Sequence, residues 1–109
     1  MRPGQRWPVR NHFGNIIHLT DERWDHITDP INHPEMIGFE EELKEAIRTG
    51  ERRQDPINPR KYRYVKVFDN LDDDNTHIIA IVLFGFTVDN FGQPVANNYI
   101  MTAYQKEIG

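Results

Sequence analysis

The chain has 109 residues, a formal net charge of −4 and no cysteine. This length predicts one domain with a single core, and the absence of cysteine excludes disulfides, zinc–thiolate sites and thiol nucleophiles. The acidic balance argues against a protein that coats nucleic acid broadly, because such binding depends on neutralising many phosphates. No apolar run approaches the ~20 residues that span a bilayer, and no secretory segment opens the chain, so we expect a cytoplasmic protein without membrane contact.

The first fourteen residues contain prolines and glycines but no periodic pattern of apolar side chains. We expect residues 1–14 to form an extended arm, partly tied down by Trp7 or Phe13. A single domain is then expected over residues 15–109, beginning with a short apolar strand at 16–19.

Two helices are expected next. Thr20 offers a side-chain oxygen as N-cap, acidic residues follow in the first turn, and Pro30 stops the helix. In the second helix the apolar side chains recur at i, i+4, i+7 and i+8, which is the spacing of one buried stripe. Gly50 is suited to cap its carboxyl end. The stripe consists of Phe39, Leu43, Ala46 and Ile47.

The rest of the chain is predicted to form a β-sheet. Residues 62–68 alternate between two faces, residues 76–86 are apolar on both faces, and residues 87–95 have the composition of a loop or hairpin turn. Strict alternation in the last strand puts Ile100, Thr102 and Tyr104 on one face. Together with the short early strand, this predicts an α+β fold in which two N-terminal helices pack on one face of a four-stranded, mainly antiparallel sheet.

Positive charge is concentrated between Arg48 and Lys66, where seven cations face two acids, a local balance of +5. Two tyrosines, Tyr62 and Tyr64, alternate with these cations. Aromatic rings among cations suit stacked bases and phosphates. The alternative is that these are ordinary solvated side chains of a loop and a strand.

Two histidines stand out. His26 is expected on the flank of the first helix, where an imidazole able to exchange protons near neutral pH can reach a cleft; the alternative is a plain exposed histidine. His33 precedes Pro34 and Glu35. The spacing of the two histidines across a helix break is poor for a metal site, so no metal is expected, and the phosphate-binding and nucleophile motifs that would indicate a cofactor or a serine hydrolase are absent.

These residues together resemble a known family. The pattern is Ile17-x-Leu19-Thr20-x-x-x-Trp24-x-His26-Ile27, then His33-Pro34-Glu35, a Tyr62-x-Tyr64 strand and a terminal Thr102-Ala103-Tyr104. It resembles the barnase–EndoU–colicin–RelE-like nuclease superfamily, and most of all its phage-associated and toxin-like branches. The resemblance covers roughly residues 15–106.

The resemblance implies a metal-independent endoribonuclease that uses no cofactor and leaves a 2′,3′-cyclic phosphate. It implies His26 as general acid or base, Thr102 and Tyr104 as groups that hold or protonate the phosphate, and Arg53 or Lys61 as the stabilising cation. The remaining residues expected to bind substrate are Arg52, Arg60, Tyr62, Arg63, Tyr64 and His33.

The partners implied are RNA and an inhibitor protein of the antitoxin kind. The alternative is a non-catalytic domain on the same fold that binds RNA or a protein. Toxin nucleases of this class are often basic, whereas this chain is acidic and carries an acidic run at 69–74. This departure points to a narrow substrate or to a member that has lost activity.

Overall fold

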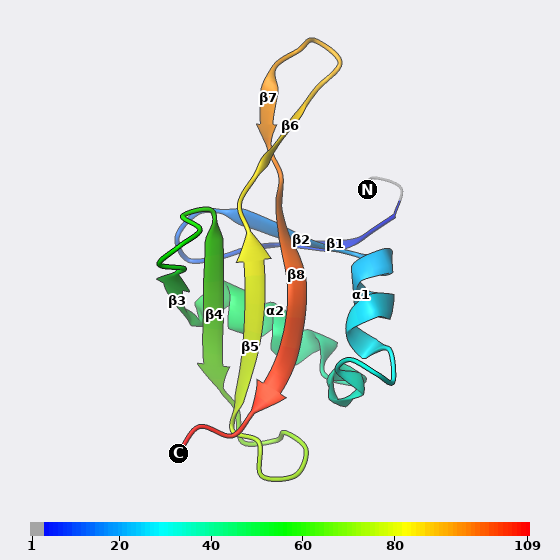
Figure 1. Ribbon diagram of the computed structural model, residues 1–109, viewed down its shortest axis with the longest axis vertical. Helices are drawn as coiled ribbons and strands as arrows, with labels where there is room; N and C mark the ends of the chain where they lie inside the picture. Colours follow the sequence, from blue (N-terminus) through cyan, green and yellow to red (C-terminus); the bar gives the residue numbers. More distant parts are fainter. Residues whose placement is uncertain (1–3) are drawn as a thin grey trace.

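The computed structural model describes residues 4–109, and Figure 1 shows the arrangement of its helices and strands. The elements are β1 (Gln5–Arg10), β2 (Ile16–Thr20), α1 (Asp21–Thr28), the short 3-10 helix η1 (Pro34–Met36), α2 (Glu40–Thr49), β3 (Glu51–Gln54), β4 (Lys61–Val67), β5 (His77–Leu83), β6 (Phe86–Val88), β7 (Pro94–Ala96) and β8 (Asn98–Lys106).

The protein is α+β, but the expectation of a four-stranded sheet is wrong. Six strands form one sheet in the order β1-β2-β8-β5-β4-β3, and β6 and β7 form a separate two-stranded sheet. β2 and β8 run parallel, while the other neighbours in the large sheet are antiparallel. The small sheet is a hairpin that projects beyond the end of the large one (Figure 1).

The additional strands lie at the two edges of the large sheet, where sequence signals are weak. In β1 the side chains of Trp7 and Val9 are buried, whereas Pro8 is exposed; proline is tolerated in an edge strand because it has no N–H to donate to a neighbour. Thus residues 5–10 of the expected arm belong to the sheet, and residues 1–3 lie outside the described part. At the other edge, β3 has only charged and polar side chains, so no apolar alternation marked it as a strand.

One face of the sheet carries the core. In Figure 1, α2 passes behind β4, β5 and β8, and α1 lies beside β8. The buried side chains of both helices share one apolar cluster with alternate residues of the central strands, among them Tyr64, Ile78, Ala80 and Val82. The opposite face of β4, β5 and β8 is not covered by any helix of residues 4–109 (Figure 1).

The caps expected at two helix ends are present. The Thr20 hydroxyl accepts a hydrogen bond from the backbone N–H of Arg23 at 3.1 Å. Gly50 ends α2 and donates its N–H to the carbonyl of Ala46. A Cβ at Gly50 would lie 2.3 Å from that carbonyl oxygen, so the close approach, rather than an unusual backbone angle, requires glycine here.

The last strand contains an irregularity that changes its faces. Ile81 of β5 lies opposite Thr102, but Val82, the next residue of β5, lies opposite Ile100. Met101 is therefore an extra residue, as in a β-bulge. The expectation that Ile100, Thr102 and Tyr104 share a face is wrong: Ile100 points into the core, while Thr102 and Tyr104 point to the uncovered face.

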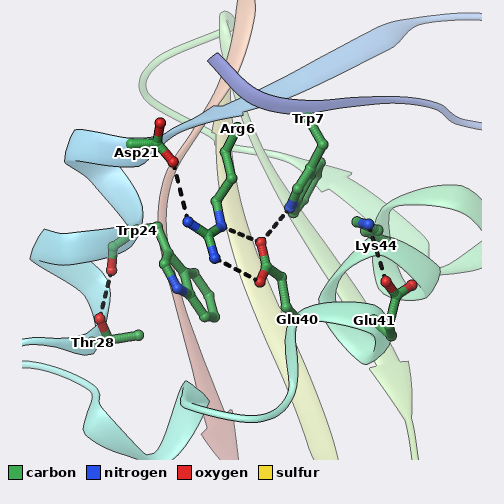
Figure 2. Close-up of polar contacts among 8 residues, drawn as sticks. All are labelled: Arg6, Trp7, Asp21, Trp24, Thr28, Glu40, Glu41 and Lys44. Carbon is green, nitrogen blue, oxygen red and sulfur yellow. Dashed lines mark hydrogen bonds and ion pairs between the residues drawn. The ribbon is translucent and has the colours of Figure 1, made fainter. Parts of the chain in front are cut away.

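A charged cluster joins β1 to both helices (Figure 2). The Arg6 guanidinium pairs with the Glu40 carboxylate of α2 and lies 3.1 Å from Asp21 of α1. The indole N–H of Trp7 donates to the same Glu40 carboxylate at 2.6 Å. The hydrogen bond from Arg6, followed by that from Trp7, lowers the pKa of Glu40 against the opposing effect of burial.

We expect Glu40→Gln to lower the free energy of unfolding by about 1–2 kcal/mol at pH 7, because it weakens hydrogen bonds to a charged acceptor. A carboxylate whose pKa is lowered by folding contributes stability above its unfolded pKa of about 4.3, and this contribution is lost as the pH falls through the folded pKa. In urea unfolding, the difference in the free energy of unfolding between wild type and Glu40→Gln should therefore become smaller as the pH is lowered from 5.

The matched control is Glu41→Gln. Glu41 lies in the same helix turn and pairs with Lys44 at 3.1 Å, but its side chain is 77% exposed. This exposed pair is expected to contribute less than about 1 kcal/mol. Equal losses in the two variants, or a difference for Glu40→Gln that does not change with pH, would contradict the stabilising role of the Arg6–Glu40 cluster.

Candidate functional site

The uncovered face of the sheet brings together residues from four strands. Arg53 of β3 lies opposite Arg63 of β4, Arg63 lies opposite Ile81 of β5, and Ile81 lies opposite Thr102 of β8. We call this line of residues the arginine–threonine row. Because neighbouring strands are about 4.8 Å apart, the backbones of Arg63 and Thr102 are separated by about 9–10 Å. A phosphate group and its ribose fit within such a span.

The neighbouring row on the same face begins with an acidic residue, Glu51 of β3, which lies opposite Val65 of β4. From Val65 it runs through Ile79 of β5 to Tyr104 of β8. Ile79 is fully buried, yet it is not part of the core cluster under the helices. Ile79 is therefore covered on the uncovered face, whereas Arg53 on the same face is exposed.

The two arginines of the arginine–threonine row carry like charges directly opposite each other. Such a cross-strand pair is unfavourable. Within residues 4–109 neither guanidinium makes a hydrogen bond, an ion pair or a ring contact. An anion bound between Arg53 and Arg63 would relieve this repulsion and satisfy the unused donors, and a phosphate matches guanidinium geometry well.

His33 lies at the edge of the sheet against Tyr104. The two ring centroids are 5.2 Å apart and the ring planes are inclined by 30°. The turn that carries His33 is held by hydrogen bonds: His33 donates its N–H to the carbonyl of Ile27, and the Asn32 side chain donates to the carbonyl of His26. The imidazole is therefore fixed in position while about 36% of the side chain stays exposed.

Glu35 orients this histidine. Its Oε2 lies 3.4 Å from His33 Nδ1 and also accepts the backbone N–H of Gln105. The Gln105 side chain, which is buried, donates back to the carbonyl of Glu35 at 2.8 Å. These contacts fix the segment to the edge of β8. Because Nδ1 faces the carboxylate, Nε2 is the ring nitrogen left for other chemistry.

His26, the expected proton carrier, is exposed on α1. Within residues 4–109 its side chain has no hydrogen bond and no ring contact, to Thr102, Tyr104 or any other residue. Arg23, three residues earlier on nearly the same side of α1, borders a depression with Tyr99 of β8. His26 is therefore on the side of α1 toward β8. The histidine whose ring contacts Tyr104 is His33.

Three expected substrate-binding residues lie on the side of the sheet that faces the helices. Tyr64 is fully buried, and its hydroxyl accepts from Asn11 at 2.6 Å and from Arg52 at 3.3 Å. Burial raises the pKa of Tyr64. The expectation that Tyr64 stacks on a base is wrong, because its ring is inaccessible.

The Arg52 guanidinium lies 3.8 Å from the ring centre of Phe13, and Tyr62 packs against Phe84.

The other two expected cations lie near the loop between β3 and β4. Arg60 donates from Nε to the carbonyl of Phe84 at 2.9 Å and so is tied to the base of the hairpin. Lys61 lies opposite Leu83, on the same face as Arg63. Of the cations named from the sequence, Arg53, Lys61 and Arg63 therefore share the uncovered face with Thr102 and Tyr104, and Arg52 does not.

The acidic loop does not border the cations of this face. Residues 69–76 connect β4 to β5 at the end of the sheet opposite the β3–β4 loop (Figure 1). The loop is fixed there by a hydrogen bond from the Asp72 N–H to Gln105. Its negative charge is therefore separated from Lys61 by the length of β4.

No family model, curated protein or solved structure matches this chain. Within residues 4–109 no three histidine, aspartate or glutamate side chains are grouped as metal ligands, and no helix is long and apolar enough to cross a membrane.

Proposed function

We propose that this protein is a metal-independent endoribonuclease whose active site is the uncovered face of β4, β5 and β8. The observation that carries the proposal is that the arginine–threonine row ends on β8 beside Tyr104, which is in ring contact with His33. An unpaired cation cluster, a hydroxyl, a phenol and an oriented imidazole are the groups needed to cleave RNA without a metal.

In the proposed reaction His33 is the general base. Its Nε2 takes the proton of a ribose 2′-hydroxyl, and that oxygen attacks the adjacent phosphorus. The bond from phosphorus to the 5′-oxygen breaks, and the Tyr104 phenol supplies the proton to the departing oxygen. The products are a 2′,3′-cyclic phosphate and a 5′-hydroxyl, so that no water is consumed. Proton transfer of this kind contributes ~10²–10⁴-fold to a rate.

The arginine–threonine row stabilises the charge that develops on the phosphate. Arg63 is the nearer of the two arginines to Thr102, one strand closer than Arg53. Its guanidinium would hold the non-bridging oxygens, and the Thr102 hydroxyl would donate to one of them. Stabilisation by fixed donors is usually the largest single contribution to catalysis.

His26 was expected from the resemblance to carry the proton, and its role stays a prediction. We give that role to His33 because, unlike His26 within residues 4–109, it has both a carboxylate partner and a contact with Tyr104. A cytoplasmic location and an inhibitor protein that covers this face belong to the same proposal. The alternative function, RNA binding without cleavage, uses the same cations and is separated by the experiment below.

The test is incubation of the wild-type protein with a mixed RNA pool in EDTA at low and high salt. We expect cleavage that resists the chelator and weakens as salt rises, because phosphate contacts are screened. Salt-sensitive RNA binding without any cleavage would favour the binding alternative. Cleavage that EDTA abolishes would contradict a metal-independent reaction.

A further inference from the structure

The hairpin of β6 and β7 projects beyond the large sheet (Figure 1). Its two strands contact mainly each other, and in the described part of the chain none of residues 86–96 belongs to the apolar core cluster. A sheet of only two strands is marginally stable in water, and it gains stability from further strands or from a covering layer. This hairpin would therefore be stabilised by the addition of another strand.

One face of the hairpin is apolar although it is exposed. Phe86 lies opposite Ala96, and Val88 lies opposite Pro94, so these four side chains share a face. Phe86 is 74% exposed, Val88 is 71% exposed, and Phe91 at the tip is 87% exposed. A phenylalanine side chain presents roughly 150–250 Å² of surface, so the two rings alone expose on the order of 300 Å². Exposed apolar patches of a few hundred Å² are often interaction sites.

The outer edge of β6 is open to another strand. The carbonyl of Gly85 and the N–H of Asp89 are both hydrogen-bonded across the hairpin, so residues 85, 87 and 89 face β7 in the antiparallel ladder. The backbone N–H and C=O groups of Phe86 and Val88 therefore point away from β7. The outer edge of β7 is less suited to pairing, because Pro94 has no N–H to donate. A further strand would add at β6.

From these features we infer that two copies of this chain pair through β6, antiparallel and about a two-fold axis, to form a four-stranded sheet in the order β7-β6-β6-β7. Phe84 donates its N–H to the carbonyl of Arg60, so the free edge begins after Phe84 and ends at the turn that follows β6. Its centre is Thr87. In this register Phe86 of each copy lies opposite Val88 of the other, and each pair exchanges two backbone hydrogen bonds. Aromatic and β-branched side chains are favourable cross-strand neighbours.

The same register brings opposite charges together. Gly85 of one copy lies opposite Asp89 of the other. A Cβ at Gly85 would lie 2.9 Å from Nη2 of Arg60, so the guanidinium occupies the place of the missing side chain and would face the carboxylate of Asp89 of the other copy. Within residues 4–109 neither Arg60 nor Asp89 has an ion pair. Two such pairs, related by the two-fold axis, favour a second copy of this chain over an unrelated strand.

The first test is sedimentation equilibrium of the wild-type protein without RNA, so its outcome does not depend on the proposed function. We expect a dimer with a dissociation constant of about 1–100 μM, because the covered surface is smaller than that of a standard interface. In hydrogen exchange, the amides of Phe86 and Val88 should gain protection as the protein concentration rises. A protein that stays monomeric at about 1 mM, or a dimer in which these two amides gain no protection, would overturn the pairing.

Charge-swap variants test the register. In Phe86→Lys/Val88→Lys the introduced lysines face each other across the two β6 strands, and in Phe86→Glu/Val88→Glu the introduced glutamates do so. Each variant alone should dimerise at least about 10-fold more weakly than wild type, whereas an equimolar mixture should form a mixed dimer in which opposite charges face each other. Both positions are exposed in the single chain, so the fold should tolerate these changes.

The matched control is Ile31→Lys/Ile37→Lys. These two isoleucines are also exposed, but they lie between α1 and α2 rather than on the hairpin, so this variant should dimerise as wild type does. If both charge-swap variants dimerised as strongly as wild type, or if their mixture formed no mixed dimer, the pairing through β6 would be wrong.

Discussion

Replacing His33 by alanine is expected to slow RNA cleavage by ~10²–10⁴-fold, because the proposed general base is removed while the cations proposed to bind phosphate remain. His33 is held by its turn, paired with Glu35 and in contact with Tyr104. The measurement is the single-turnover rate of cleavage of one RNA oligonucleotide in EDTA across pH 5–8.

Two other histidines serve as controls for His33→Ala. His12 belongs to the connection between β1 and β2, where its ring packs against Phe13, and His12→Ala should leave the rate within about 2-fold of wild type. His26→Ala should cost less than about 10-fold, since its ring touches no residue of the site. If the cleavage rate fell as much in His26→Ala as in His33→Ala, or more, His26 rather than His33 would be identified as the residue that transfers the proton.

Replacing Arg63 by methionine is expected to slow cleavage by ~10²–10³-fold, the usual effect of removing one donor to the developing charge. Arg63→Lys should recover only part of this rate, because an ammonium group lacks the two parallel donors of a guanidinium. Thermal unfolding should show no loss of stability for Arg63→Met, and even a small gain, because the repulsion between Arg63 and Arg53 is removed.

The control for Arg63 is Arg48→Met. Arg48 is exposed on α2, the helix that covers the opposite side of the sheet, and it pairs with Glu45 at 3.3 Å. Its replacement changes the net charge equally, so a general electrostatic effect on RNA binding would appear in both variants. Equal loss of rate in Arg48→Met and Arg63→Met would contradict a direct contact of Arg63 with the phosphate.

Much of the helical layer could be predicted from the sequence. The apolar stripe of α2 and the N-cap at Thr20 depend on local spacing and local hydrogen bonds, and both are present. The edge strands could not be predicted in the same way. β3 lacks apolar residues, and β1 contains a proline; both are strands because a neighbour offers hydrogen bonds, which is a property of the whole sheet.

The candidate site, too, could be predicted from the sequence only in part. Thr102, Tyr104 and Arg63 were named from the sequence, and they share one face. Thr102 and Tyr104 lie on that face while Ile100 points into the core because of the bulge at Met101, which an alternating pattern cannot reveal. A tyrosine among cations suggests stacking on a base, but alternation alone does not say which side of a strand the helices cover, and Tyr64 lies on the covered side. The sequence His33-Pro34-Glu35 signalled a rigid histidine–carboxylate pair, while its contact with Tyr104 needed the tertiary fold.

We propose that this sheet face cleaves RNA by attack of the neighbouring 2′-hydroxyl on the phosphate. The most direct measurement is mass spectrometry of the new ends formed by wild type in EDTA, on one RNA sequence and on the same sequence with every 2′-hydroxyl methylated. We expect 2′,3′-cyclic phosphate and 5′-hydroxyl ends from the first substrate and no cleavage of the second. Cleavage of the methylated strand, or ends that carry a 5′-phosphate, would contradict it.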